Sequence, residues 1–270
     1  MCGTDPLTGR SFEHRRAWIE SRLLQLASLF SLDVYAYAVM RNHYHIVVRL
    51  EPRGPEAWSA SEVAARWIDI NLPGTHDSSN AAAREEKIQA LLDDPEYLST
   101  CRNRLGSLSW YMRFLNHPIA CRANQEDDCR GHFWESRYKS FALLDEAAVV
   151  ACMAYVDLNP IRAGAARSLA GSEHTSIKQR LKRPGQTDLA PFPLDQTPST
   201  SLLNLSLDEY VAFLNQTGLV PTSSRSPPDH TKRARVMSMA SHQRAYGARD
   251  SLDRWVSTLD QHWFKGTALP

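Results

Sequence analysis

Two β-rich runs decide the fold: Val34-Tyr-Ala-Tyr-Ala-Val-Met40 and His43-Tyr-His-Ile-Val-Val-Arg-Leu50, separated by Arg41-Asn42. Valine, isoleucine and tyrosine are enriched in strands, and two polar residues between such runs suit a tight turn. The stretch therefore predicts a β-hairpin. Because side chains alternate across a strand, His43 and His45 are expected on one face and Tyr44 on the other.

This pairing of His43 and His45 suits a metal site. Two neutral imidazoles on one face leave several coordination positions open for oxygen ligands from water or a phosphate. An isolated His-x-His is more often an ordinary pair of strand histidines, so the motif needs a second element.

Upstream of the hairpin, the sequence predicts a helix that begins at Ser11 as N-cap and runs to Phe30. Its apolar residues recur at spacings of three and four, which places them on one helical face: Ile19, Leu23, Leu26 and Phe30.

Downstream, residues 51–105 mix proline, glycine and serine with two amphipathic stretches, which indicates a helical insertion. A helix from about 107 to 116 and a strand from 132 to about 142 are expected next. In the C-terminal region, Ser206 and Glu209 predict a capping box for a short helix ending at Gly218, and a last amphipathic helix includes Leu252 to Trp263. Linkers rich in proline, serine and threonine are expected from about Pro184 and over about 221–230.

A helix capped by Asp145 and running to Asn159 supplies the second chemical element. Tyr155 and Asn159 are four residues apart and so share one helical face. A tyrosine is a covalent nucleophile toward phosphorus when its proton is removed and a metal polarises the phosphoryl oxygen. The alternatives stay open: Tyr155 as a hydrogen-bonded core residue, and Asn159 as the cap of a turn that starts at Pro160.

The composition is that of an ordinary globular protein, with 270 residues, 43% hydrophobic residues and a net charge of +1. It excludes disorder throughout and gives no overall basic signature for nucleic acid. The five cysteines form no regular framework, the N-terminus lacks the pattern of a signal peptide, and no apolar run approaches the ~20 residues of a membrane span. We therefore expect a soluble cytoplasmic protein with no membrane partner.

Three segments in this order resemble the single-tyrosine HUH transposase family, which includes the REP-associated tyrosine transposases. They are Arg41-Asn-His-Tyr-His45, Gly131-His-Phe-Trp-Glu-Ser-Arg-Tyr-Lys139 and Ala154-Tyr-Val-Asp-Leu-Asn-Pro-Ile-Arg-Ala-Gly164. The resemblance covers about Ser11 to Arg183. It implies an α+β fold with a ferredoxin-like antiparallel sheet and helices on one face. The nuclease domain would occupy 1–183, with 51–105 as its helical insertion, and 184–270 would be a linker and a small helical C-terminal region.

The same resemblance implies a role for each matching residue. Tyr155 would form a 5′-phosphotyrosine and leave a free 3′ hydroxyl, and His43, His45 and Asn159 would hold Mg²⁺ or Mn²⁺. The substrate would be single-stranded DNA, with hairpin or palindromic element ends, cut and rejoined in DNA transposition. A homodimer is an expected partner arrangement, and it stays open whether the tyrosine helix acts on its own site or on a partner's. The DNA-bound protein would lie at the nucleoid.

Three basic residues are candidate DNA contacts: Arg137, Lys139 and Arg162. For the first two, an ordinary charged strand face is an equally good interpretation. Tyr138 is a rival nucleophile without a polar partner at helical spacing.

A zinc site formed by His117, Cys121, Cys129 and His132 is a minor alternative, since the spacing matches no common finger.

The sequence departs from the family at its start, because only ten residues precede Ser11 where the family has a strand. Part of a central strand is therefore expected to be missing. This departure motivates an alternative function, a domesticated or inactive protein of the same fold that binds DNA hairpins without cutting them.

Overall fold

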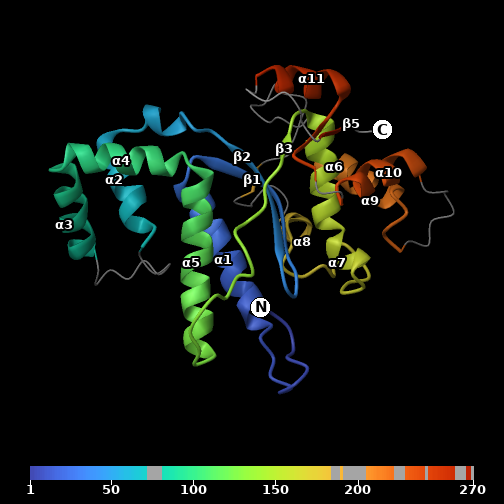
Figure 1. Ribbon diagram of the computed structural model, residues 1–270, viewed down its shortest axis with the longest axis horizontal. Coiled ribbons are helices and arrows are strands. Elements are labelled where there is room, and N and C mark those ends of the chain that lie inside the picture. The colour runs from blue at the N-terminus through green and yellow to red at the C-terminus, as the bar shows by residue number, and fades with distance from the viewer. Residues whose placement is uncertain are drawn as a thin grey trace. The chain divides into compact units, whose positions relative to one another are not determined.

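A computed structural model describes residues 1–71, 81–183, 189–190, 205–221, 229–240, 243–258 and 266–268 (Figure 1). These residues form a mixed α+β protein that is mostly helical. The chain divides into two compact units: unit 1 comprises Met1–Val34 and Val48–Arg137, and unit 2 comprises Tyr35–Val47 and Tyr138–Pro270. None of the described helices combines the length and apolar character needed to cross a bilayer.

The predicted hairpin is present as strands β1 (Leu32–Val39) and β2 (Tyr44–Leu50). They pair as a two-stranded sheet, and the amide of Met40 donates to the carbonyl of His43 at 2.9 Å to close the turn. Along the other edge of β1, Ala38 forms an antiparallel bridge with Thr175. The α+β class is thus observed with a small antiparallel sheet.

Unit 1 is built mainly from helices around α1 (His14–Leu29). The others are η1 (Gly54–Ala57), α2 (Ala60–Asp69), α3 (Ala81–Leu92), α4 (Pro95–Leu105) and α5 (Leu108–Glu126). Helix α1 packs on α5, and α2 packs on α3 and α4. The described residues of 51–105 therefore contain four helical elements.

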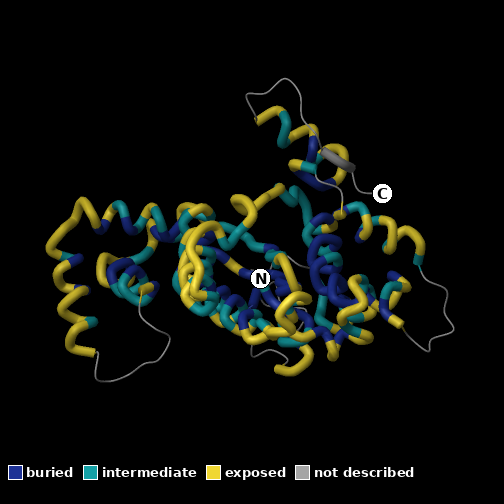
Figure 2. The backbone as a smooth tube through the Cα atoms, turned by 60° about the horizontal axis from the view of Figure 1, so that its bottom comes forward, coloured by how far each residue is buried: buried dark blue, intermediate teal, exposed yellow. Residues whose placement is uncertain are grey.

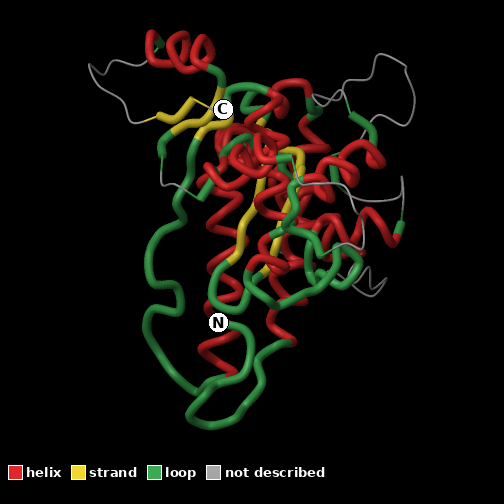
Figure 3. The backbone as a smooth tube through the Cα atoms, turned by 90° about the vertical axis from the view of Figure 1, so that its right-hand side faces the viewer, coloured by secondary structure: helices red, strands yellow, loops and turns green. Residues whose placement is uncertain are grey.

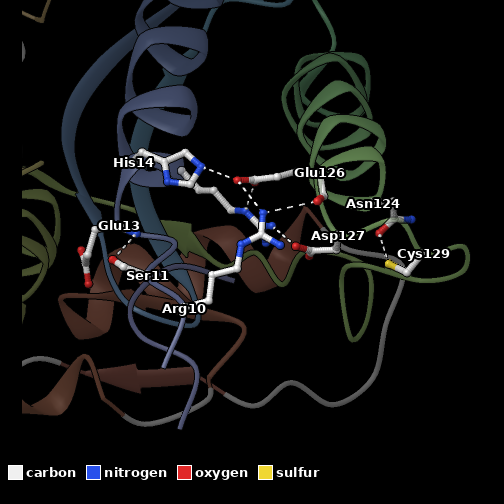
Figure 4. A network of polar contacts seen from close by, with 9 residues as sticks. Arg10, Ser11, Glu13, His14, Asn124, Glu126, Asp127 and Cys129 are labelled. Atoms are coloured by element: carbon white, nitrogen blue, oxygen red, sulfur yellow. Dashed lines mark hydrogen bonds and ion pairs between the residues drawn. The ribbon is translucent and has the colours of Figure 1, made fainter. Parts of the chain in front are cut away.

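The start of α1 corrects one prediction. Ser11 is not its N-cap, because Glu13 occupies that position without a side-chain cap bond, and Ser11 instead bridges Thr4 in an antiparallel turn. Buried Arg15 ties this end of α1 to the end of α5 through ion pairs with Glu126 and Asp127. Figure 4 labels these two acids, with His14 of α1 facing Glu126. These contacts offset the missing cap by joining two helix ends.

Helix α5 is longer than predicted, since it continues through Pro118 to Glu126. A proline has no amide hydrogen, so the carbonyl of Phe114 loses its usual helical donor. Arg22 of α1 replaces that donor: its Nε donates to the Phe114 carbonyl at 3.2 Å, and its Nη1 donates to the Ile70 carbonyl at 2.9 Å. A side chain from another helix thus stabilises the interruption, which the local sequence does not reveal.

The predicted strand from His132 to about Ala142 is wrong for most of its length. Residues 132–141 are irregular and mostly exposed, and only β3 (Ala142–Leu143) is a strand (Figure 3). Within the described residues, no strand pairs with 132–141, so its backbone lacks the ladder that a strand requires. Trp134 anchors the segment to α5 by donating its Nε1 hydrogen to the Asn116 carbonyl at 3.0 Å.

Unit 2 has its core where β1 and α6 (Glu146–Asp157) meet. Buried residues of both elements, including Ala38 and Ala151, pack in one cluster. Figure 2 colours the buried stretches of the backbone dark blue. As predicted, Asp145 caps α6 by accepting from the amide of Ala148 at 2.9 Å.

The hairpin strands and β3 precede α6 in sequence, and the other elements of unit 2 follow it. They are α7 (Asn159–Arg162), α8 (Ser176–Lys182), α9 (Leu207–Gln216), α10 (His230–Ser238), β4 (Ala245–Gly247), α11 (Arg249–Ser257) and β5 (Gly266–Ala268). Strands β3, β4 and β5 form a parallel sheet.

The C-terminal predictions are met in part. The capping box of Ser206 and Glu209 at the start of α9 is confirmed. Most of the two predicted linkers, and the last residues of the final amphipathic helix, lie outside the described residues.

Candidate functional site

The two histidines lie together where the turn leads into β2, with His43 just before the strand and His45 within it. The ring centroids of His43 and His45 are 4.9 Å apart, with the ring planes at 76°. Asn42 lies 2.8 Å from His43, measured from its Oδ1 to Nδ1 of the ring. A hydrogen on Nδ1 would donate to this oxygen and leave Nε2 with its lone pair free, which is how outer partners orient a ligating histidine. Asn42 is not among the residues predicted from the sequence, and its place beside the His-x-His motif is the signal that points to it.

Tyr155 of α6 approaches these histidines within unit 2. Its ring centroid lies 5.7 Å from that of His45, in an edge-on arrangement with the planes at 78°. Arg162 of α7 covers the same phenol ring, with its guanidinium carbon 4.5 Å from the ring centroid. Folding therefore gathers four side chains from three elements, and we call them the histidine–tyrosine cluster: His43, His45, Tyr155 and Arg162.

The cluster favours neutral imidazoles. Burial lowers the pKa of His45 to about 4, and the charges of His43 and Arg162 add to this effect. His43 is more exposed, and partial desolvation of its ring also lowers its pKa. At neutral pH both rings therefore present lone pairs, which a metal ion requires.

The cluster is also poor in acids. No described carboxylate forms an ion pair with Arg162. The nearest acid along α6 and α7, Asp157, is fully buried and bound by other groups. Arg162 is thus a cation available to an anionic ligand, and a phosphate group has the matching chemistry.

Asn159 follows Tyr155 by one helical turn and opens α7, with 8% of its surface exposed. In the described part of the chain, its amide forms no hydrogen bond with either histidine. The described histidines, cysteines and acids also form no group of three able to hold a metal ion. As donor types, imidazole nitrogens and an amide oxygen are compatible with a divalent ion that keeps oxygen ligands from water or phosphate.

The remaining candidates lie outside the cluster. Arg137 and Lys139 are exposed in the irregular segment 132–141, so they do not share the predicted strand face. Tyr138, the rival nucleophile, lies between them and is 37% exposed.

The zinc alternative finds little support. The Sγ atom of Cys121 lies 3.7 Å from Nε2 of His117, whereas the thiol of Cys129 contacts Asn124 (Figure 4). These four residues do not meet as a ligand set among the described residues.

Comparison of the chain with protein-family models, curated proteins and solved structures gives no match.

Proposed function

We propose that this protein is a metal-dependent transposase that nicks single-stranded DNA and transfers the strand through a 5′-phosphotyrosine on Tyr155. The observation that carries the proposal is the 5.7 Å approach of the Tyr155 ring to His45. The sequence resemblance requires the segment of His45 and the segment of Tyr155 to lie in contact, although they are far apart in the chain. An unrelated pair of strand histidines gives no reason for it.

The chemistry uses the residues of the cluster. The phenol oxygen of Tyr155 attacks phosphorus and forms a new O–P bond, its proton leaves to solvent, and the bond from phosphorus to the 3′ oxygen breaks. The departing 3′ oxygen takes up a proton. Arg162 lies over the phenol ring, where its guanidinium binds non-bridging phosphate oxygens and holds the scissile group in line.

His43, His45 and Asn159 would hold Mg²⁺ or Mn²⁺, and a bound ion would neutralise charge on the non-bridging oxygens. Rejoining is the reverse displacement, in which a 3′ hydroxyl attacks the phosphotyrosine and releases the phenol. Because the phosphodiester energy is conserved in the covalent link, no nucleotide cofactor is needed.

The finer fold assignment, a ferredoxin-like sheet with helices on one face, is part of the proposal. The bridge from Ala38 to Thr175 supports it, because it extends the hairpin by backbone pairing along the other edge of β1. The packing of α6 on the hairpin supports a helical layer on one face. Exposed Arg137 and Lys139 would contact DNA phosphates outside the cluster.

A second candidate is a protein of the same fold that binds DNA hairpins without cutting them. Two observations favour it. The described residues provide no third histidine, cysteine or acid that could join His43 and His45 as a metal ligand. The residues before α1 form a turn closed by Thr4 and Ser11, where the family has a strand of its sheet. Binding of this kind would not depend on Tyr155.

The test uses single-stranded hairpins with randomised flanks, Mn²⁺ and separate labels on the 5′ and 3′ sides. We expect a covalent adduct that survives denaturation, carries the 3′-side label and disappears with chelator. Tyr155→Phe should abolish it, whereas the matched variant Tyr138→Phe should keep it. An absent adduct, or one undiminished in Tyr155→Phe, would refute the proposal. Hairpin binding without an adduct, insensitive to chelator, would establish the second candidate.

A further inference from the structure

A buried carboxylate lies two residues after the proposed nucleophile. Asp157, at the end of α6, is fully buried and accepts three hydrogen bonds. Oδ1 accepts from the Ser176 hydroxyl at 2.5 Å and from the Ile177 amide at 3.0 Å, and Oδ2 accepts from the Tyr210 hydroxyl at 2.8 Å. Burial raises its pKa, and these hydrogen bonds oppose that effect.

The same network reaches the strand that leads into the histidine hairpin. The amide of Tyr37 on β1 donates to Oγ of Ser176 at 3.0 Å, so one hydroxyl joins α6 to β1. Two residues after Tyr37 and two residues before Ser176, the amide of Val39 donates to the carbonyl of His174 at 3.0 Å.

A second link between the same partners passes through Arg180. Its guanidinium donates to the carbonyl of Tyr35 on β1 at 2.6 Å, and its charge acts on Asp157. The strand and the helix are thus connected by hydrogen bonds through Ser176, by the charge of Arg180 and by apolar packing.

Helical geometry explains why this anchor controls Tyr155. Two residues correspond to a rotation of about 200° around a helix, so Tyr155 and Asp157 point in nearly opposite directions. Anchoring Asp157 on one side therefore directs Tyr155 toward His45 on the other. Apolar packing alone tolerates small rotations and shifts, whereas three directional hydrogen bonds to one carboxylate do not.

Burying a charge costs free energy because the charge loses its water, and an apolar side chain of similar volume often stabilises a core as well or better. A positioning role accounts for the presence of a carboxylate at this point. We propose that Asp157 is a positioning residue that, through Ser176, sets the register of the tyrosine helix on the histidine hairpin. Its effect on catalysis rests on the proposed function, while the register itself is measurable without any activity.

The test compares Asp157→Ala and Asp157→Asn with Leu214→Ala, which shortens a buried side chain one helical turn after Tyr210 on α9 and removes no hydrogen bond of the network. The register is measured by the nuclear Overhauser effect between ring protons of Tyr155 and His45. Adduct formation and hairpin binding are measured on the same proteins, and circular dichroism identifies those that are folded.

In folded Asp157→Ala we expect loss of this nuclear Overhauser effect and adduct formation slowed by about tenfold to a hundredfold, with hairpin binding kept. Asp157→Asn should be intermediate, since its amide oxygen still accepts from Ser176. Leu214→Ala should keep the effect at wild-type intensity.

An unchanged effect in both Asp157 variants, or an equal loss in Leu214→Ala, would overturn the inference. If Asp157→Ala does not fold, Asp157→Asn and Ser176→Ala carry the test. A wild-type protein that forms no adduct would refute the proposed function and leave the register measurement valid.

Discussion

Protonation of His45 is expected to destabilise unit 2 of the metal-free protein as the pH falls. Its pKa of about 4 in the folded chain lies below its ordinary value of 6.5. Between these two values the unfolded chain binds a proton that the folded chain does not. The stability contributed by the neutral ring is therefore complete above about pH 6.5 and decreases as the pH falls toward 4.

The size of the effect follows from the shift. A difference of about 2.5 pKa units corresponds to about 3 kcal/mol, and the partial exposure of the ring reduces this to on the order of 2 kcal/mol. A domain with 5–15 kcal/mol of total stability would lose a measurable fraction. His43 acts in the same direction, because desolvation lowers its pKa too.

The test uses the substitution His45→Gln, which keeps a polar side chain and removes the imidazole that binds a proton. Urea unfolding would be measured with chelator at pH values from about 7.5 to 4.5. The nuclear magnetic resonance signal of His174 reports on unit 2 in both proteins. His14→Gln is the matched control, because this exposed histidine pairs with Glu126 in unit 1.

We expect wild type and His14→Gln to lose about 2 kcal/mol more of unit 2 stability on acidification than His45→Gln. A direct titration of the His45 signal should give a value far below 6.5. Titration near 6.5, or the same pH dependence in His45→Gln as in wild type, would show that the ring is not desolvated as the structure indicates.

Three further substitutions test the packing, each by urea or thermal unfolding. Arg22→Ala removes donors from two carbonyls of unit 1 and should lower the free energy of unfolding by about 2–4 kcal/mol. A loss below about 1 kcal/mol would contradict the role of Arg22 as the replacement donor at Pro118. Gly106→Ala places a Cβ 2.5 Å from the carbonyl oxygen of Pro52, so we expect a loss of about 1–3 kcal/mol, and a neutral result would exclude this close approach. Asp145→Ala removes the cap of α6 and should lower the free energy of unfolding by about 1–2 kcal/mol, with partial recovery in Asp145→Asn. Equal stabilities of wild type and the two Asp145 variants would count against the cap.

Local patterns in the sequence determine a large part of this protein. The hairpin of 34–50, the common face of His43 and His45, and the cap at Asp145 each follow from a few consecutive residues. Strand alternation and helix capping act over one to four positions, so the printed sequence is sufficient to predict them.

Other elements depend on partners that are distant in the chain. Residues 132–141 have the composition of a strand but pair with none in the described chain, and α5 passes through Pro118 because Arg22 supplies the missing donor. Neither outcome follows from local propensity, since a strand needs a neighbour and a broken helix needs a replacement bond.

The candidate site shows the same division. The sequence supplies the imidazoles and the phenol, and only the packing of α6 on the hairpin brings Tyr155 to His45. The anchor at Asp157 is visible only in the folded chain, because its donors come from segments that follow α6. Hydrogen bonds and ring contacts depend on distances of a few ångströms, and folding sets those distances between residues that are far apart in the sequence.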